Sequence, residues 1–157
     1  MYLWLKLAHL IAVLLLATGD IGSLLVATRA RRAATTIEVV TLMRMHHFTV
    51  MAGVIPGAIG SLVTGALLVQ QAQMSFTSTW VLGSFVAWGA SLAVGVGLLV
   101  PAESRALKEG DRLLASGTTA PSDALRAAVG APIVWIGEWS TVVLLVAMTA
   151  LMVLKPV

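Results

Sequence analysis

Four long apolar runs constrain this chain more than any other feature of its sequence. They cover roughly residues 3–27, 48–70, 80–101 and 132–154. Each run reaches the ~20 apolar residues that a helix needs to cross a bilayer. Only 11% of the residues are charged, whereas a soluble domain averages about 25%. We therefore predict an all-α integral membrane four-helix bundle embedded in a lipid bilayer.

The predicted helices extend beyond the apolar runs wherever helix-favouring sequence continues. We expect helices at about 3–27, 36–71, 80–112 and 122–155, within a single transmembrane domain that covers residues 1–157. The segments TTIEVVTLMRMHH and ESRALKEGDRLLA lengthen the second and third helices. Pro121 and Ser122 mark the start of the fourth. Pro56 removes a backbone hydrogen bond inside the second helix and predicts a kink there.

Basic residues in the connections predict how the bundle lies in the membrane. The first connection, 28–46, carries a net charge of +3, and the second, QQAQMSFTST, carries none. The third, 102–131, holds four basic and four acidic groups. Because Lys and Arg accumulate on the cytoplasmic side, we expect both the N-terminus and the C-terminus to be non-cytoplasmic. We expect the membrane to be the bacterial inner (cytoplasmic) membrane, with the first helix retained rather than cleaved.

Several function classes are excluded by what the sequence lacks. The chain has no cysteine, which excludes disulfides, Cys-ligated zinc, iron–sulfur clusters and thiol nucleophiles. It contains no P-loop, dinucleotide fingerprint, serine nucleophile elbow or HExxH motif. The excess charge of +3 matches that of one connection, which fits membrane orientation and predicts no nucleic-acid binding.

Ionisable side chains within the apolar helices are the candidates for function, because hydrocarbon penalises them unless they are paired, hydrated or liganded. His9 is a candidate haem or metal ligand, and the alternative is a core histidine bonded to a neighbouring helix. A second axial ligand must come from the same level of the bundle. The candidates are a Met148 or Met152 thioether, the Lys6 amine, or His9 of a second copy in a homodimer.

A second polar group is expected toward the cytoplasmic side. Asp20 lies on the same face of the first helix as its histidine, about 16 Å further along the axis. Glu138 lies at a similar depth on the fourth helix. Together with His47, these carboxylates offer a divalent-cation site or steps of a proton relay. The alternative is a buried charge network, in which Arg44 or a protonated His46 neutralises one of the carboxylates.

Short motifs along nearly the whole chain resemble two groups of membrane proteins. The opening LK-x-x-H, the W…VP stretch from Trp80 to Pro101 and the close MVLKP resemble predicted four-helix integral membrane proteins of unknown function. More distantly, YLWLKLAHLIAV resembles the opening of the HemJ-type membrane protoporphyrinogen oxidases, with their W-x-K-x-x-H pattern. The stretch from Pro56 to Gly65 is similar to their P…T-G segment, and LMVLKPV is similar to their terminal V-K-P-F.

The HemJ resemblance implies a role for one residue in particular. In that family the first-helix histidine binds haem b, and the matching position here is His9. The family also has a W-x-x-x-K pattern in its third helix, where this chain has WVLGSFVAW and no lysine. Its R-L-F-V-Y-H segment is replaced by VATRARR. The resemblance therefore implies haem b at His9 and leaves oxidoreductase activity open.

These observations predict a small polytopic membrane protein that binds haem b through His9. We expect it to act in membrane redox chemistry or electron transfer, exchanging electrons with quinone or a partner complex. One alternative is a non-catalytic accessory subunit that packs against a larger membrane complex through its glycine stripes. A third hypothesis is metal or proton transport past Asp20, His47 and Glu138.

Overall fold

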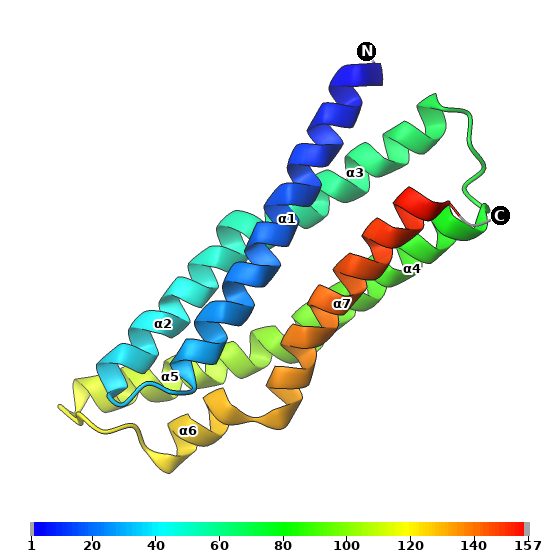
Figure 1. The fold of residues 1–157 in the computed structure, drawn as a ribbon. Helices are drawn as coiled ribbons and strands as arrows, with labels where there is room; N and C mark the ends of the chain where they lie inside the picture. The colour runs from blue at the N-terminus through cyan, green and yellow to red at the C-terminus, as the bar shows by residue number, and fades with distance from the viewer. Residues whose placement is uncertain (1, 156–157) are drawn as a thin grey trace.

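The computed structural model describes residues 2–155, and every regular element in this range is helical (Figure 1). In chain order the elements are α1 (Tyr2–Ala30), α2 (Thr36–Thr49), the π-helical turn η1 (Val50–Val54), α3 (Ile55–Gln71), α4 (Thr79–Val94), the π-helical turn η2 (Gly95–Leu99), α5 (Val100–Ala115), α6 (Asp123–Gly130) and α7 (Pro132–Leu154).

Four segments within the described residues are long and apolar enough to cross a membrane. They are Tyr2–Ala30, Thr36–Gln71, Thr79–Ala115 and Asp123–Leu154. Large apolar side chains are exposed along their outer faces, as in helices that face lipid: Leu14 and Leu25 of α1, Val86 of α4, and Val143 and Val146 of α7 are examples. The prediction of an all-α chain with four spanning helices is confirmed.

The two ends of the bundle differ in construction (Figure 1). One end, here the terminal end, holds both described chain ends and the α3–α4 connection, residues 72–78. The opposite end, here the cap end, holds the α1–α2 and α5–α6 connections, residues 31–35 and 116–122. A hydrophobic core fills the cap end, made by Ala30, Ala33, Val39, Met43, Ala106, Leu113, Leu125 and Val129.

Two of the spanning segments contain a π-helical turn immediately before a proline. The backbone N–H of Ile55 donates to Val50 O, and that of Val100 donates to Gly95 O, each across five residues. Pro56 and Pro101 follow by one residue. A proline lacks the N–H donor and its ring clashes with the carbonyl four residues earlier, and a widened turn accommodates both effects. The irregularity expected at Pro56 therefore takes the form of η1, and η2 repeats it.

Small residues of the second segment allow α1 and α3 to approach closely. A Cβ atom added to Gly57 would lie 2.7 Å from Leu16 Cα, and one added to Gly53 would lie 3.0 Å from Gly19 Cα. Such contacts are typical of small-residue helix packing in membranes. Gly53 and Gly57 therefore form helix contacts within the chain, against α1.

The fourth predicted helix, 122–155, is interrupted in the structure. Ala131 has φ −55° and ψ 127°, which ends α6 and starts α7 at the next residue. Pro132 follows it, and a proline disfavours helical backbone at the preceding residue. The short helix α6 thereby folds against the cap-end core through its buried Leu125 and Val129.

Candidate functional site

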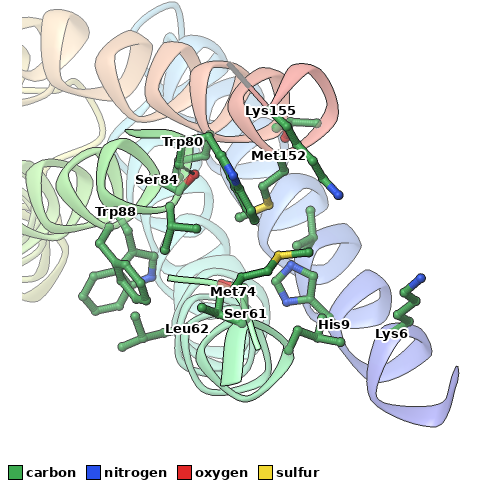
Figure 2. Close-up of a pocket in the computed structure, with 18 of the residues that line it drawn as sticks. Lys6, His9, Ser61, Leu62, Met74, Trp80, Ser84, Trp88, Met152 and Lys155 are labelled. Atoms are coloured by element: carbon green, nitrogen blue, oxygen red, sulfur yellow. Dashed lines mark hydrogen bonds between the residues drawn. The ribbon is translucent and has the colours of Figure 1, made fainter. Parts of the chain in front are cut away.

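A cavity of about 220 Å³ lies between the four spanning segments near the terminal end (Figure 2). Its lining comes from α1, α3, α4, α7 and the α3–α4 connection. Most of its lining is apolar and aromatic, with Trp80, Phe85 and Trp88 on the α4 side and Leu16 and Leu62 on the other. A cavity of this kind, largely apolar with a few convergent polar groups, is typical of small-molecule sites.

His9 of α1 is a titratable side chain in the lining of this cavity (Figure 2). Its Nδ1 lies 2.9 Å from Thr64 Oγ1 on α3. Thr64 donates its own hydroxyl proton to the carbonyl of Gly60, one turn earlier. The hydroxyl oxygen therefore accepts from His9, which assigns the proton to Nδ1. Nε2, the second ring nitrogen, takes no part in the bond with Thr64.

This arrangement has the form of a supported histidine ligand. Histidines that ligate metals almost always donate the second ring N–H to a neighbouring acceptor, which fixes the tautomer and the ring orientation. The backbone leaves room for the ring at this level, because a Cβ on Gly65 would lie 3.2 Å from His9 Cε1. His9 is thus bonded to a neighbouring helix, an arrangement that the alternative of a core histidine also predicts.

Three methionines line the same cavity. Met148 and Met152 come from α7, as the sequence predicts for side chains at the level of His9. Met74 comes from the α3–α4 connection, and Figure 2 shows it extending toward the centre of the cavity with His9 and Met152 around it. The thioether sulfurs of all three are soft donors of the kind that complete a haem site.

Two lysines flank the opening of the cavity. Lys6 comes from α1 and Lys155 from the end of α7, and both belong to the lining (Figure 2). Lys6 Nζ lies 4.3 Å from the centre of the Tyr2 ring, and Lys155 Nζ lies 5.6 Å from that of Trp80. Lys155 has left-handed backbone, φ 44°, where α7 ends. An apolar cavity with two ammonium groups at its rim suits an apolar molecule that carries anionic groups at one edge.

A second polar site, here the carboxylate cluster, lies closer to the cap end and consists of Asp20, His46, Glu103 and Glu138. His46 is its centre: Nδ1 lies 3.3 Å from Glu103 Oε1 and Nε2 lies 3.0 Å from Glu138 Oε1. The His46 side chain is 5% exposed, and the two carboxylates are 8% and 3% exposed. Each of the two ring nitrogens therefore faces a buried carboxylate oxygen.

Close helix packing holds two of the carboxylates inside the bundle. A Cβ added to Gly19 would lie 2.7 Å from the backbone nitrogen of Val54 in η1, and one added to Gly137 would lie 2.8 Å from Leu99 Cδ2 in η2. Asp20 and Glu138 directly follow these glycines. Asp20 and Glu138 thus belong to helices, α1 and α7, that pack closely against the π-helical turns η1 and η2.

The structure places the other predicted members of this cluster separately. Arg44 is 65% exposed and forms an ion pair with Asp111 of α5 at 2.8 Å, so it does not neutralise the buried carboxylates. It precedes His46 by two residues, which turns it to another face of α2. His47 is 50% exposed, and its Nδ1 lies 3.4 Å from Glu103 Oε1. Within residues 2–155 no three His, Cys, Asp or Glu side chains are arranged to hold a metal ion.

Glu103 is the main residue of this cluster that the sequence analysis does not single out, because it lies in the charged stretch 102–131, which resembles a connection. The third helix continues through it, and the buried residues of α5 are Glu103, Ala106, Gly110 and Leu113. Their spacing of three, four and three residues is the inward stripe of an amphipathic helix. When this spacing is applied to the sequence ESRALKEGDRLL, it places Glu103 on the buried face of the helix.

Comparison with known proteins places the whole chain in one family. A family model described as "Predicted integral membrane protein (DUF2269)" matches residues 3–156. No curated protein and no solved structure matches the chain. The match includes all four spanning segments, both polar sites and the cap-end core.

Proposed function

The chain belongs to the DUF2269 family of predicted integral membrane proteins, and within it we propose that this protein binds haem b through His9 and serves in membrane redox chemistry or electron transfer. The observation that carries the proposal is the His9–Thr64 hydrogen bond. It leaves Nε2 as an available donor atom inside an apolar cavity. The resemblance of Trp4, Lys6 and His9 to the HemJ-type W-x-K-x-x-H pattern supports the same ligand.

The residues around the cavity suit haem b in their chemistry. His9 supplies an imidazole, and a thioether from Met74, Met148 or Met152 is available as a second axial ligand. Lys6 and Lys155 provide ammonium groups for the two propionates at the rim. Bound haem would supply a one-electron redox centre, and a methionine ligand would raise its reduction potential. The protein contributes orientation, exclusion of water and charge balance.

The size of the cavity adds a requirement. A cavity of about 150 Å³ holds a molecule the size of benzene, so 220 Å³ is too small for a whole macrocycle. Haem binding therefore requires the α1/α3 and α4/α7 pairs to move apart at the terminal end. Trp88 Nε1 donates to Ala58 O at 3.2 Å and links α4 directly to α3. We expect this bond to break when haem enters.

The orientation of the bundle is part of the same proposal. Of the ten basic residues, Lys6 and Lys155 lie at the terminal end, and the others are Arg29, Arg31, Arg32, Arg44, Arg105, Lys108, Arg112 and Arg126. The positive-inside rule then places the cap end in the cytoplasm of a bacterium and opens the cavity to the outer side of the inner membrane. We propose quinone or a partner complex as the electron-exchange partner.

A haem titration tests the proposal. The purified apoprotein in detergent is titrated with haem, and the reduced-minus-oxidised spectrum is recorded. We expect saturation at one haem per chain with b-type bands, and loss of these bands in His9→Ala but not in His47→Ala. If His9→Ala binds haem as tightly as the wild type, the proposal is wrong. Displacement of haem by a quinone analogue, or quinone binding without haem, would instead assign the cavity to a ring-sized quinone headgroup.

One observation favours a second candidate function, that of an accessory subunit. A Cβ added to Gly89, Gly95 or Gly97 would meet nothing within 4 Å, so these three positions of α4 and η2 have no close neighbour among residues 2–155. Small residues of this kind allow close approach of another membrane helix. Purification in mild detergent with Gly89→Leu as the variant tests this function. A second protein that is lost on this substitution would support it, and a wild-type preparation free of other proteins would contradict it.

A further inference from the structure

The carboxylate cluster carries more acid groups than it has bases to balance them. Asp20, Glu103 and Glu138 are buried, and His46 is the buried base among them. With every group ionised, the cluster has a net charge of −2, and a cationic His47 at its edge reduces this to −1. Arg44 pairs with Asp111 instead, and α3, η1 and η2 contribute no ionisable side chain. An unbalanced charge inside a membrane domain is costly, which favours binding of a proton.

The two carboxylate oxygens of Glu138 have different neighbours. Ser23 Oγ lies 2.9 Å from the backbone carbonyl of Asp20 and 3.3 Å from Glu138 Oε2. In both contacts the Ser23 hydroxyl is the donor. Oε2 of Glu138 is therefore an acceptor, and Oε1, which faces His46 Nε2 at 3.0 Å, is the oxygen that can take up a proton from the ring.

A continuous path connects this acid with the surface of the protein. His47 is half exposed, and its Nδ1 lies 3.4 Å from Glu103 Oε1. The same oxygen lies 3.3 Å from His46 Nδ1, and His46 Nε2 lies 3.0 Å from Glu138 Oε1. An imidazole that accepts a proton on one nitrogen and releases the proton of the other is a proton shuttle.

We propose that Glu138 is a proton-binding site of the membrane domain, loaded from the cap end through His47, Glu103 and His46. A proton from water reaches Glu103 by way of His47. It passes to His46 Nδ1, while the proton on Nε2 moves to Glu138 Oε1. The imidazole ends neutral with its proton on Nδ1, Glu103 is again a carboxylate, and one proton has been taken up. No electron is transferred, and no haem is required.

Infrared spectroscopy of the haem-free protein in nanodiscs tests the site. We expect a protonated-carboxyl carbonyl band on going from pH 8 to pH 5, lost in Glu138→Gln. The matched control is Glu109→Gln, a half-buried glutamate outside the cluster that is paired with Arg112, which should keep the band. A wild type without this band, or a Glu138→Gln variant with undiminished intensity, would overturn the proposal.

Two further variants test the neighbours of Glu138 and do not depend on the folding of Glu138→Gln. Ser23→Ala removes the donor to Oε2, so the carbonyl band of protonated Glu138 should move to higher frequency, and an unmoved band contradicts the assignment. After a pH jump, His46→Gln should slow the growth of the band at least tenfold. An unchanged rate would rule out the path through His46. Because all measurements use haem-free protein, their outcome is independent of haem binding at His9.

Discussion

His9 Nδ1 lies 2.9 Å from Thr64 Oγ1, and this bond joins the first spanning helix to the second at the level of the cavity. The hydroxyl that accepts it is itself oriented by the carbonyl of Gly60. The Gly60 carbonyl orients the Thr64 hydroxyl, and the position of that hydroxyl determines that Nδ1 is the imidazole nitrogen that carries the proton. If His9 binds haem as proposed, its ring orientation is already set by this bond.

Replacing Thr64 by valine tests this preparation. Valine keeps the shape of threonine but removes the acceptor, so His9 loses its orientation, and loss of such a supporting bond typically lowers affinity about 10–100-fold. We expect a weakening of haem binding in this range, measured by titration. Thr49→Val is the matched control, because Thr49 is half-buried and also bonds to a carbonyl one turn earlier but lies outside the cavity. Equal affinities in the two variants would contradict the role of Thr64.

Gly57→Ala tests the close packing of α1 on α3. The added Cβ would lie 2.7 Å from Leu16 Cα, and backbone must shift to admit it. Overpacking of this kind typically costs 1–3 kcal/mol, about 2 kcal/mol being our expectation, measured by thermal unfolding in detergent. Gly89→Ala is the control, because its Cβ meets nothing within 4 Å and alanine favours helix by roughly 1 kcal/mol. If the two variants melt at the same temperature, the α1–α3 contact does not limit stability.

The sequence predicts the architecture and much of the cavity, because both follow from local patterns. Apolar run length predicts the four spanning helices, and helix periodicity places His9, Met148 and Met152 at one level, where the structure brings them around one cavity. Their role as haem ligands stays a prediction. Met74 is absent from that prediction because it lies in a connection, whose conformation no helical period describes.

The carboxylate cluster is harder to predict, since it depends on contacts between distant segments. The pairing of His46 with Glu103 joins α2 to α5, and its pairing with Glu138 joins α2 to α7. The charges in the sequence do not distinguish Arg44 from His46 as the partner of the buried acids. The helix direction decides between them: His46 faces inward and is buried, whereas Arg44 faces outward to Asp111.

The adjacent histidines provide a test of this cluster through stability. His46→Ala leaves two buried carboxylates without their shared partner, and breaking a buried pair typically costs about 3–5 kcal/mol. His47→Ala removes a half-exposed side chain, and a loss below about 1 kcal/mol is expected for an exposed pair. Unfolding at neutral pH measures both. A larger loss of stability for His47→Ala than for His46→Ala would contradict the assigned geometry. Addition of Glu138→Gln to His46→Ala should restore part of the stability.

Trp88→Phe tests whether the two helix pairs separate to admit haem. Phenylalanine keeps most of the aromatic packing but removes the N–H that donates to Ala58 O. The bond is lost during opening, so its absence should speed haem uptake several-fold without changing the final spectrum, as measured by stopped-flow absorption. Trp139→Phe, on α7 and outside the cavity lining, is the control. Slower uptake in Trp88→Phe would show that the bond does not restrain opening.

The central claim is tested most directly by the visible spectrum of the protein purified from cells supplied with haem. The reduced-minus-oxidised spectrum and a pyridine haemochrome assay together give the haem type and its ratio to protein. The account predicts haem b at about one per chain in the wild type and in His47→Ala, and none in His9→Ala. A featureless wild-type spectrum, or one that His9→Ala leaves unchanged, would contradict haem binding at His9.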